Sequence, residues 1–134
     1  MFSPANRVRT VQPTNFSITI RQAGRISLLD VSGSLTFFEI GALRDAISRL
    51  LKQGRRDIVL NLSGLQYLDS SGIGELARIY VSVVKANGQM KVVGLSRRVE
   101  EILKITQLHQ VLPEFPTEEA ALQSFPEFNR KETI

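Results

Sequence analysis

Two short, almost continuous apolar runs with a helical pattern between them constrain the fold more than any other feature of this sequence. The runs DIVLNL at residues 57–62 and MKVV at 90–93 have the length and composition of strands buried on both faces of a parallel sheet. Between them, apolar residues recur at helical spacing to about Asn87, and Gly88 is expected to end the helix. Because parallel neighbours need a crossover connection, this stretch predicts a β-α-β unit.

The rest of the chain extends this unit into a larger sheet. Residues 16–21 alternate apolar and polar side chains, which is typical of a strand with one solvated face, and a turn at 22–25 predicts a hairpin. The further predicted elements are strands at 26–31 and 112–115 and helices at 40–53, 96–106 and 117–125. This order predicts an α/β fold, with a mixed, mostly parallel sheet of about five strands, one antiparallel edge strand and about four covering helices.

Length and composition fit one domain of this kind. At 134 residues and 43% hydrophobic content, the chain can bury one core and is too short for two. We expect a flexible arm at residues 1–14, the domain at 15–125 and a polar tail at 126–134. No stretch approaches the roughly 18 apolar residues of a membrane span, and the N-terminus lacks the apolar core of a signal peptide. A cytoplasmic protein without direct membrane insertion is therefore expected.

Charge and cysteine content argue against several classes of function. The 17 Lys and Arg residues exceed the 13 Asp and Glu residues, but they are scattered, and the sharpest cluster is Arg55-Arg56. Because the chain has no Trp and no basic stripe interleaved with aromatic residues, nucleic-acid binding is not expected. The absence of cysteine excludes thiolate catalysis and Cys-ligated metals.

The segment YLDSSGIGEL at residues 67–76 lies where a strand gives way to a helix. It places an acid and two serines at the carboxyl end of a strand, where function collects in open α/β sheets. The unpaired N–H groups at the start of the helix would stabilise a phosphate on Ser70 or Ser71. Asp, Ser and Gly are also the ordinary residues of a helix N-cap, so local chemistry leaves a cap and a switch open and favours the cap.

Catalytic interpretations of this segment fail on spacing. A nucleophile elbow needs Gly-x-Ser-x-Gly, and a phosphate-binding loop needs a lysine after its glycines. His109 is the sole histidine, and one histidine without cysteine assembles neither a metal site nor a convincing general base. We expect a protein that is not an enzyme and that has no metal site and no cofactor.

Two local patterns predict the surroundings of the segment. Thr36 and Glu39 fit a capping box at the start of the first helix. On a helical wheel, the predicted core face of the next helix consists of Ile73, Leu76, Ala77, Tyr80 and Val84, and the polar face of Glu75, Arg78, Ser82 and Lys85. Ile79 falls toward the polar side, so we expect it to form a small docking patch with Phe37 and Phe38.

The runs IVLNLSGL at 58–65 and YLDSSGIG at 67–74 resemble the signature of STAS domains, in particular the bacterial anti-sigma factor antagonists. The later run GQMKVVGLSRRVEEILKITQLHQVLPEFPTEEAAL follows the family pattern as well, so the resemblance covers about residues 15–125. It implies a STAS fold with the element order predicted above.

The resemblance also implies a mechanism. In such antagonists the serine directly after the aspartate is phosphorylated by a partner that is both anti-sigma factor and serine kinase; this serine maps onto Ser70, with Ser71 as the second choice. The unphosphorylated antagonist binds that partner, which frees a sigma factor and so regulates transcription. The phosphorylated form is released until a serine/threonine phosphatase of the metal-dependent class restores it. Asp69 would orient the acceptor serine or oppose the phosphate, and Ser71 would be the residue that caps the helix.

The implied partner surface differs from the family pattern at three positions. Many members carry acids where this chain has Ser34 and Thr36, and often Asp where it has Asn61. The partner-binding positions expected here are Asp69, Ser71, Gly72, Ile73, Gly74, Glu75, Arg78, Ile79, Ser34, Thr36 and Phe37. A weak homodimer is a further expectation.

A second hypothesis comes from another class of protein. The chain would be a STAS scaffold or accessory subunit, such as a component of a stressosome-like assembly or of a lipid transporter, without an obligatory phospho-switch. This hypothesis predicts a stable oligomer or a membrane-complex partner and little effect of Ser70 substitution. Nucleotide binding by the domain itself is a third option, but the chain lacks a phosphate loop.

Overall fold

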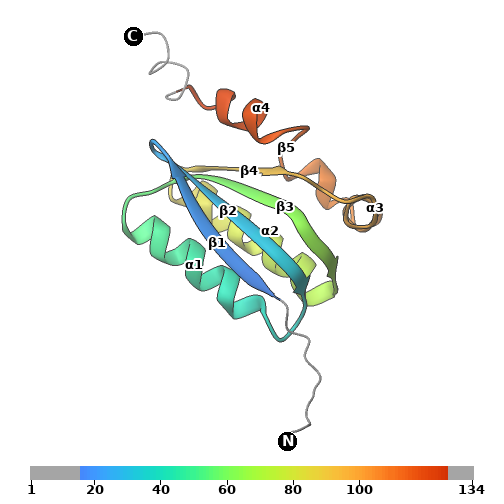
Figure 1. The fold of residues 1–134 in the computed structure, drawn as a ribbon. Coiled ribbons are helices and arrows are strands. Elements are labelled where there is room, and N and C mark those ends of the chain that lie inside the picture. The colour runs from blue at the N-terminus through green and yellow to red at the C-terminus, as the bar shows by residue number, and fades with distance from the viewer. Residues whose placement is uncertain (1–15, 127–134) are drawn as a thin grey trace, which may run out of the picture.

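The computed structural model describes residues 16–126, which form a five-stranded sheet with helices on both faces (Figure 1). In chain order the elements are β1 (Ser17–Ala23), β2 (Ile26–Leu35), α1 (Ile40–Lys52), β3 (Asp57–Leu68), α2 (Ser70–Lys85), β4 (Gln89–Val93), α3 (Arg97–Ile105), the 3-10 helix η2 (Leu108–Gln110), β5 (Glu114–Phe115) and α4 (Glu118–Gln123). The predicted arm at 1–14 and, apart from Pro126, the predicted tail lie outside the described residues. The domain boundaries stay predictions.

The sheet has the predicted topology. Its strands are ordered β1-β2-β3-β4-β5, with β1 antiparallel to β2 and every other pair parallel. This confirms the predicted fold class, including the single antiparallel edge strand. The element that the sequence patterns missed is η2, a short turn of helix between α3 and β5.

The central strands β2 and β3 are longer than predicted, and their extra length brings the two loops of interest together. They pair past two register irregularities, one after Asp30 and one after Gly33, and their last partners are Leu35 and Leu68. Ser32 pairs with Gly64, where a Cβ would lie only 2.4 Å from the Ser32 hydroxyl oxygen. Because Gly64 has no side chain, the two strands can approach this closely, and both continue beyond their predicted ends.

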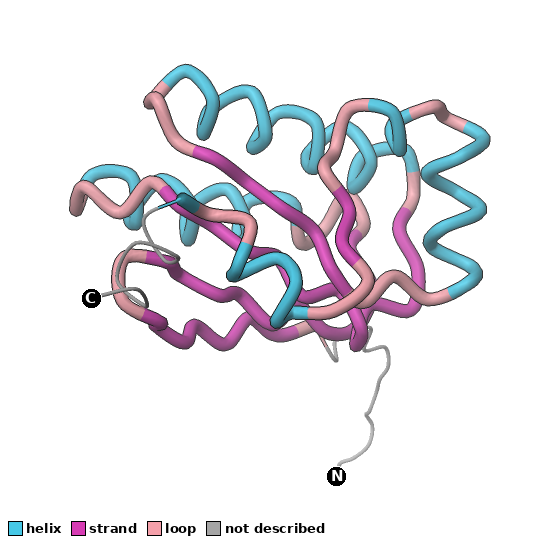
Figure 2. Tube along the Cα trace, turned by 90° about the horizontal axis from the view of Figure 1, so that it is seen from above, coloured by secondary structure: helices cyan, strands magenta, loops and turns pink. Residues whose placement is uncertain are grey.

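Each face of the sheet has its own apolar layer. On one face α1 and α2 run side by side, and α3 packs near them (Figures 1 and 2). The smaller layer on the other face is formed by Ile26, Leu28, Val59, Val93, Ala121 and Phe125, where α4 packs. Among residues 16–126, no helix has the length and apolar character needed to cross a bilayer.

The predicted orientation of α2 is correct for Leu76, which is buried, and for Ile73, Ala77 and Tyr80, which pack against the core, but it is wrong for three residues. Its buried residues are Gly72, Glu75, Leu76, Ile79 and Val83, so Glu75 and Ile79 lie inside rather than at the surface. Val84, which was predicted to be in the core, is 47% exposed. The reason is that α2 packs against both the sheet and α1, which rotates its buried face toward α1.

Helix ends follow the predicted chemistry in part. Gly54 has φ +82° and its N–H donates to Leu51, which ends α1 as expected. At the end of α2, however, Asn87 takes the left-handed conformation at φ 65°, and Gly88 is the next residue. Gly88 is required there by packing, because a Cβ would lie 2.1 Å from the carbonyl oxygen of Arg56.

The predicted capping box at the start of α1 is half formed. The Glu39 carboxylate accepts from the Thr36 backbone N–H at 2.9 Å and from the Thr36 hydroxyl at 2.6 Å. The Thr36 hydroxyl does not accept from Glu39, because the Glu39 N–H donates to the Thr36 carbonyl at 2.9 Å. The N-cap residue of the helix is therefore Glu39, three residues beyond the predicted cap, and the helix begins at Ile40.

The C-terminal helix α4 is tied to the sheet by charged side chains. Thr117 caps it as predicted, accepting from the Ala120 N–H at 3.0 Å. Arg21 on β1 pairs with both Asp30 on β2 and Glu118 on α4, and the Asn61 amide donates to Glu118 at 2.7 Å. The hydrogen bond from Arg21 is the main reason why the pKa of Glu118 lies below its ordinary value.

We predict that Glu118→Gln lowers the free energy of unfolding at pH 7 by about 1 kcal/mol. The pKa of Glu118 is lowered in the folded state, so its stabilisation is complete above the ordinary value of 4.5 and is lost as the pH falls through the folded pKa. Urea denaturation at several pH values should show the difference from the parent protein shrinking below about pH 4. Glu119→Gln in the same helical turn is the control, and an equal loss in both variants would contradict this account.

Candidate functional site

The side chain of Asp69 joins the two loops that follow β2 and β3. Its Oδ1 accepts from the Gly72 N–H at 2.9 Å, which makes Asp69 the N-cap of α2. Its Oδ2 accepts from the Phe37 N–H at 3.2 Å, in the loop before α1. Asp69 also donates its own N–H to the Leu35 carbonyl at 3.3 Å. One residue thus fixes the start of α2 against the end of the neighbouring strand.

Gly72 allows α2 to start this close to the end of β2; we call the contacts of Asp69 with Gly72, Phe37 and Leu35 the Asp69 joint. A Cβ at this position would lie 2.2 Å from the Leu35 carbonyl oxygen, so any side chain would push the first turn of α2 away from β2. Gly74 is less restricted, because the nearest atom to its Cβ would be the flexible Arg78 guanidinium at 3.3 Å. Ile73 is half-buried and packs against the core.

The two serines occupy the first two positions of α2. The expectation that Ser71 caps the helix is wrong, because Asp69 already caps it and the helix begins at Ser70. The Ser70 side chain is exposed and Ser71 is half-buried, and neither hydroxyl forms a hydrogen bond within residues 16–126. An exposed hydroxyl at the positive end of a 16-residue helix can accept a phosphate, whose charge the helix dipole would stabilise.

Glu75 is a buried acid between α1 and α2. Its side chain is fully buried, its Oε1 lies 3.1 Å from Arg44 Nη2 on α1 and 3.7 Å from Arg78 Nε, and its Oε2 has no hydrogen-bond partner within the described residues. Arg44 was not among the predicted site residues, because its partner lies 31 positions away. The guanidiniums of Arg44 and Arg78 are exposed to solvent, whereas the acid beneath them is buried. The predicted surface position is therefore confirmed for Arg78 and wrong for Glu75.

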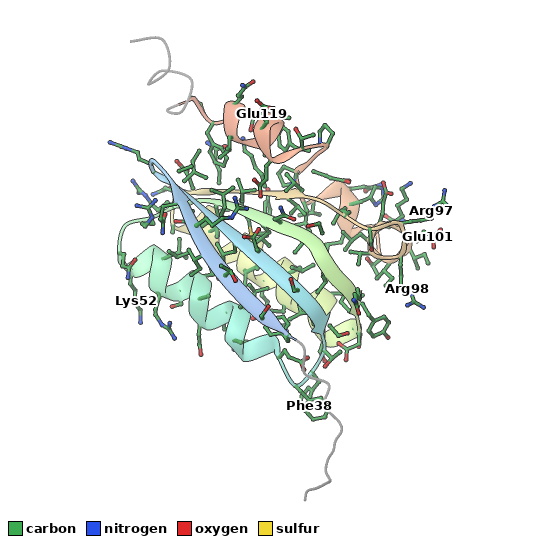
Figure 3. The ribbon with its side chains drawn as sticks, viewed as in Figure 1. Phe38, Lys52, Arg97, Arg98, Glu101 and Glu119 are labelled. Atoms are coloured by element: carbon green, nitrogen blue, oxygen red, sulfur yellow. The ribbon has the colours of Figure 1, made fainter. Side chains whose placement is uncertain are left out.

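Aromatic side chains surround the Asp69 joint at the surface. Phe37 and Phe38 are 65% and 84% exposed, and their rings pack edge to face with centroids 5.7 Å apart. Figure 3 shows Phe38 at the end of the molecule where β2 and β3 finish. Tyr67, 42% exposed, pairs with half-buried Ser34. Successive side chains of a strand point to opposite faces, so burial of Leu68 implies an outward Tyr67. This alternation could have added Tyr67 to the predicted site residues.

Apart from Gly72, Ile73, Gly74 and Arg78, the predicted site residues divide into two groups. Ser34, Thr36, Phe37, Asp69, Ser70 and Ser71 meet around the ends of β2 and β3. Glu75 and Ile79 belong to the interior of the same helix and offer no side-chain surface. The predicted apolar patch consequently loses Ile79 and retains Phe37 and Phe38.

Comparison with known proteins matches residues 17–121 to the model of the STAS domain family. An anti-sigma-B factor antagonist from Staphylococcus aureus is 26% identical over 102 residues, which cover 73% of this chain and 91% of that protein.

Solved structures show the same fold. An anti-sigma factor antagonist from Mycobacterium paratuberculosis has a TM-score of 0.75 and 25% identity, with 86% of this chain and 97% of that chain covered. The Bacillus cell fate determinant SpoIIAA in its phosphorylated form has a TM-score of 0.63 and 21% identity, covering 80% and 97% of the two chains. The resemblance seen in the sequence is thereby confirmed.

We predict that Asp69→Ala lowers the free energy of unfolding by about 2 kcal/mol, because it removes both an N-cap and the bond to the Phe37 N–H. Asp69→Asn should retain most of the stability, since Asn is an equally good cap. Urea denaturation measures both variants, with Asp45→Ala on the exposed face of α1 as the control. If the urea midpoint of Asp69→Ala equals that of the parent protein, the two hydrogen bonds of Asp69 do not stabilise the fold.

Proposed function

The chain belongs to the STAS domain family, and from this premise we propose that it is an anti-sigma factor antagonist controlled by phosphorylation of Ser70. In the unphosphorylated state it binds an anti-sigma factor that is also a serine kinase. Transfer of a phosphate to Ser70 releases the antagonist, and a serine/threonine phosphatase of the metal-dependent class restores it. The chain itself acts as a binding protein and not as an enzyme, in the cytoplasm, as a monomer or weak homodimer.

The observation that carries the proposal is the position of the Ser70 hydroxyl. It is exposed at the first position of α2, directly after the Asp69 cap, and a kinase can reach it without unfolding the helix. Ser71 is half-buried at the second position, which favours Ser70 as the acceptor. The relatives support the same function, because both an S. aureus protein and a structurally similar M. paratuberculosis protein are anti-sigma factor antagonists.

The phosphate would act at the surface rather than on the fold. A phosphoserine at the start of a helix carries about −1.5 to −2 charges and is stabilised by the helix dipole. The same charge at the centre of a packed interface adds a desolvation cost and repels acidic groups of the partner. Phosphorylation therefore leaves the folded antagonist intact and weakens its complex.

The proposed partner surface is centred on Asp69 and includes the exposed aromatic rings. Phe37 and Phe38 stand on the loop that Asp69 holds against α2, so they lie beside the proposed phosphorylation site. Exposed aromatic side chains of this kind are typical anchors of protein interfaces. Ser34 and Thr36, where many family members have acids, make this surface less negative than that of a typical antagonist.

We predict that a cognate anti-sigma kinase with ATP labels Ser70, as mapped by mass spectrometry, and that Ser70→Ala abolishes the label while Ser71→Ala retains it. Ser70→Asp should weaken binding to the partner at least tenfold, about 1.4 kcal/mol, without lowering the stability of the fold. Labelling at another residue would count against the proposal. A stable oligomer whose assembly is unchanged by either Ser70 substitution would favour the scaffold hypothesis.

A second prediction concerns the aromatic pair. Phe38→Ser should weaken partner binding by about tenfold to a hundredfold, as loss of an interface anchor does, and should leave the thermal midpoint unchanged because the ring is 84% exposed. Ile105→Ser at the end of α3 removes an equally exposed apolar side chain, 81%, and serves as the control. Equal affinities of the two variants would place the interface elsewhere.

A further inference from the structure

A cavity of about 440 Å³ lies at the end of the sheet opposite to Asp69, where β3 and β4 begin. Three connections meet there: the β1–β2 turn, the α1–β3 loop and the α2–β4 loop. Its polar lining includes Arg25, Arg55, Arg56, Asp57, Asn87 and Gln89. This volume is within the range of small-molecule sites, roughly 300 to 1,000 Å³.

The cavity has an excess of positive charge, with three guanidiniums against one carboxylate. The last turns of the two long helices add Arg49, Lys52 and Lys85 at the same end of the molecule, where Figure 3 shows Lys52. The Arg55-Arg56 cluster, the sharpest in the sequence, is thus part of a larger basic region. The proposed antagonist function uses the opposite end of the sheet, where Asp69 lies, so it does not explain this basic region.

The walls of the cavity are fixed by short contacts. Arg55 donates to the Ser27 hydroxyl and to the Gly24 carbonyl, each at 2.8 Å. The Gln89 N–H donates to the Arg56 carbonyl at 3.0 Å, and Gly88 packs tightly against the same carbonyl. The cavity is therefore formed before any ligand arrives.

Capping of helix carbonyls, a frequent role of arginines near helix C-termini, does not occupy Arg56. The last carbonyls of α1 already accept backbone N–H groups of Gly54 and Arg55, and those of α2 accept from Asn87 and Gly88. Within residues 16–126 the Arg56 guanidinium has no hydrogen-bond or ion-pair partner. The exposed Arg56 guanidinium, which has no side-chain partner among residues 16–126, is therefore available to a ligand in the cavity.

We propose that this cavity binds a small anion that carries phosphoryl groups, with Arg56 as the main cation. A guanidinium presents a planar pair of donors that matches two phosphate oxygens, and the side-chain amides of Asn87 and Gln89 supply further donors. Recognition is by side chains from three loops and does not require a glycine-rich phosphate loop. The inference is independent of Ser70 and of the proposed antagonist function.

Pyrophosphate and ADP are the two probes for this site, titrated into the full chain at low ionic strength by calorimetry and by NMR of the backbone amides. We expect saturable binding of both, with the largest shifts at Gly54 and Gln89 and none at Ser70. Equal affinities would identify free phosphate as sufficient, and tighter binding of ADP would identify a nucleotide. Arg56→Gln should weaken binding at least tenfold, with an unchanged thermal midpoint because its side chain is exposed.

Arg98→Gln is the matched control, since it removes the same charge from α3, away from the cavity (Figure 3). This variant should bind as the parent chain does. The proposal is overturned if neither probe saturates at millimolar concentration, if both variants lose affinity equally, or if the amide shifts map to the Asp69 end.

Discussion

The parallel pairing of β2 with β3, carried through two register irregularities to Leu35 and Leu68, is the constraint on which the rest of the structure depends. It makes two connecting loops start side by side, so that a single carboxylate can bond to both. Asp69 uses one oxygen for the first turn of α2 and the other for the loop before α1. The exposed serine and the exposed aromatic pair owe their proximity to this joint.

The two ends of the sheet differ in chemistry because helices start at one end and finish at the other. At the carboxyl ends, a helix starts after an acid cap and presents hydroxyls and rings. At the amino ends, α1 and α2 finish, and basic residues of their last turns gather with Arg25, Arg55 and Arg56. Helix dipoles favour this polarity, since cations are stabilised near C-termini. The net charge of +4 is therefore a sum over the whole chain and does not show this difference between the two ends.

The sequence predicted the element order and the topology because these depend on local period and on the rules for crossover connections. It failed where a residue's surroundings come from a distant segment. Glu75 looked like a surface acid, and its burial becomes understandable only when α1 brings Arg44 to 3.1 Å. Asp69, Ser70 and Ser71 are all good caps, so the choice among them depends on where β3 ends, which is at Leu68, opposite Leu35 of β2.

The strand order, which increases steadily from β1 to β5, has a consequence for recognition. Open α/β sheets form a ligand crevice at the carboxyl edge where successive crossovers diverge to opposite faces. Here the three helical crossovers between parallel strands pack in one layer, on the face of α1 and α2, so the order supplies no such divergence. Within residues 16–126, the carboxyl edge therefore has no topological switch point. Its exposed rings, Phe37, Phe38 and Tyr67, lie at the surface of the molecule instead of lining a crevice between diverging crossovers.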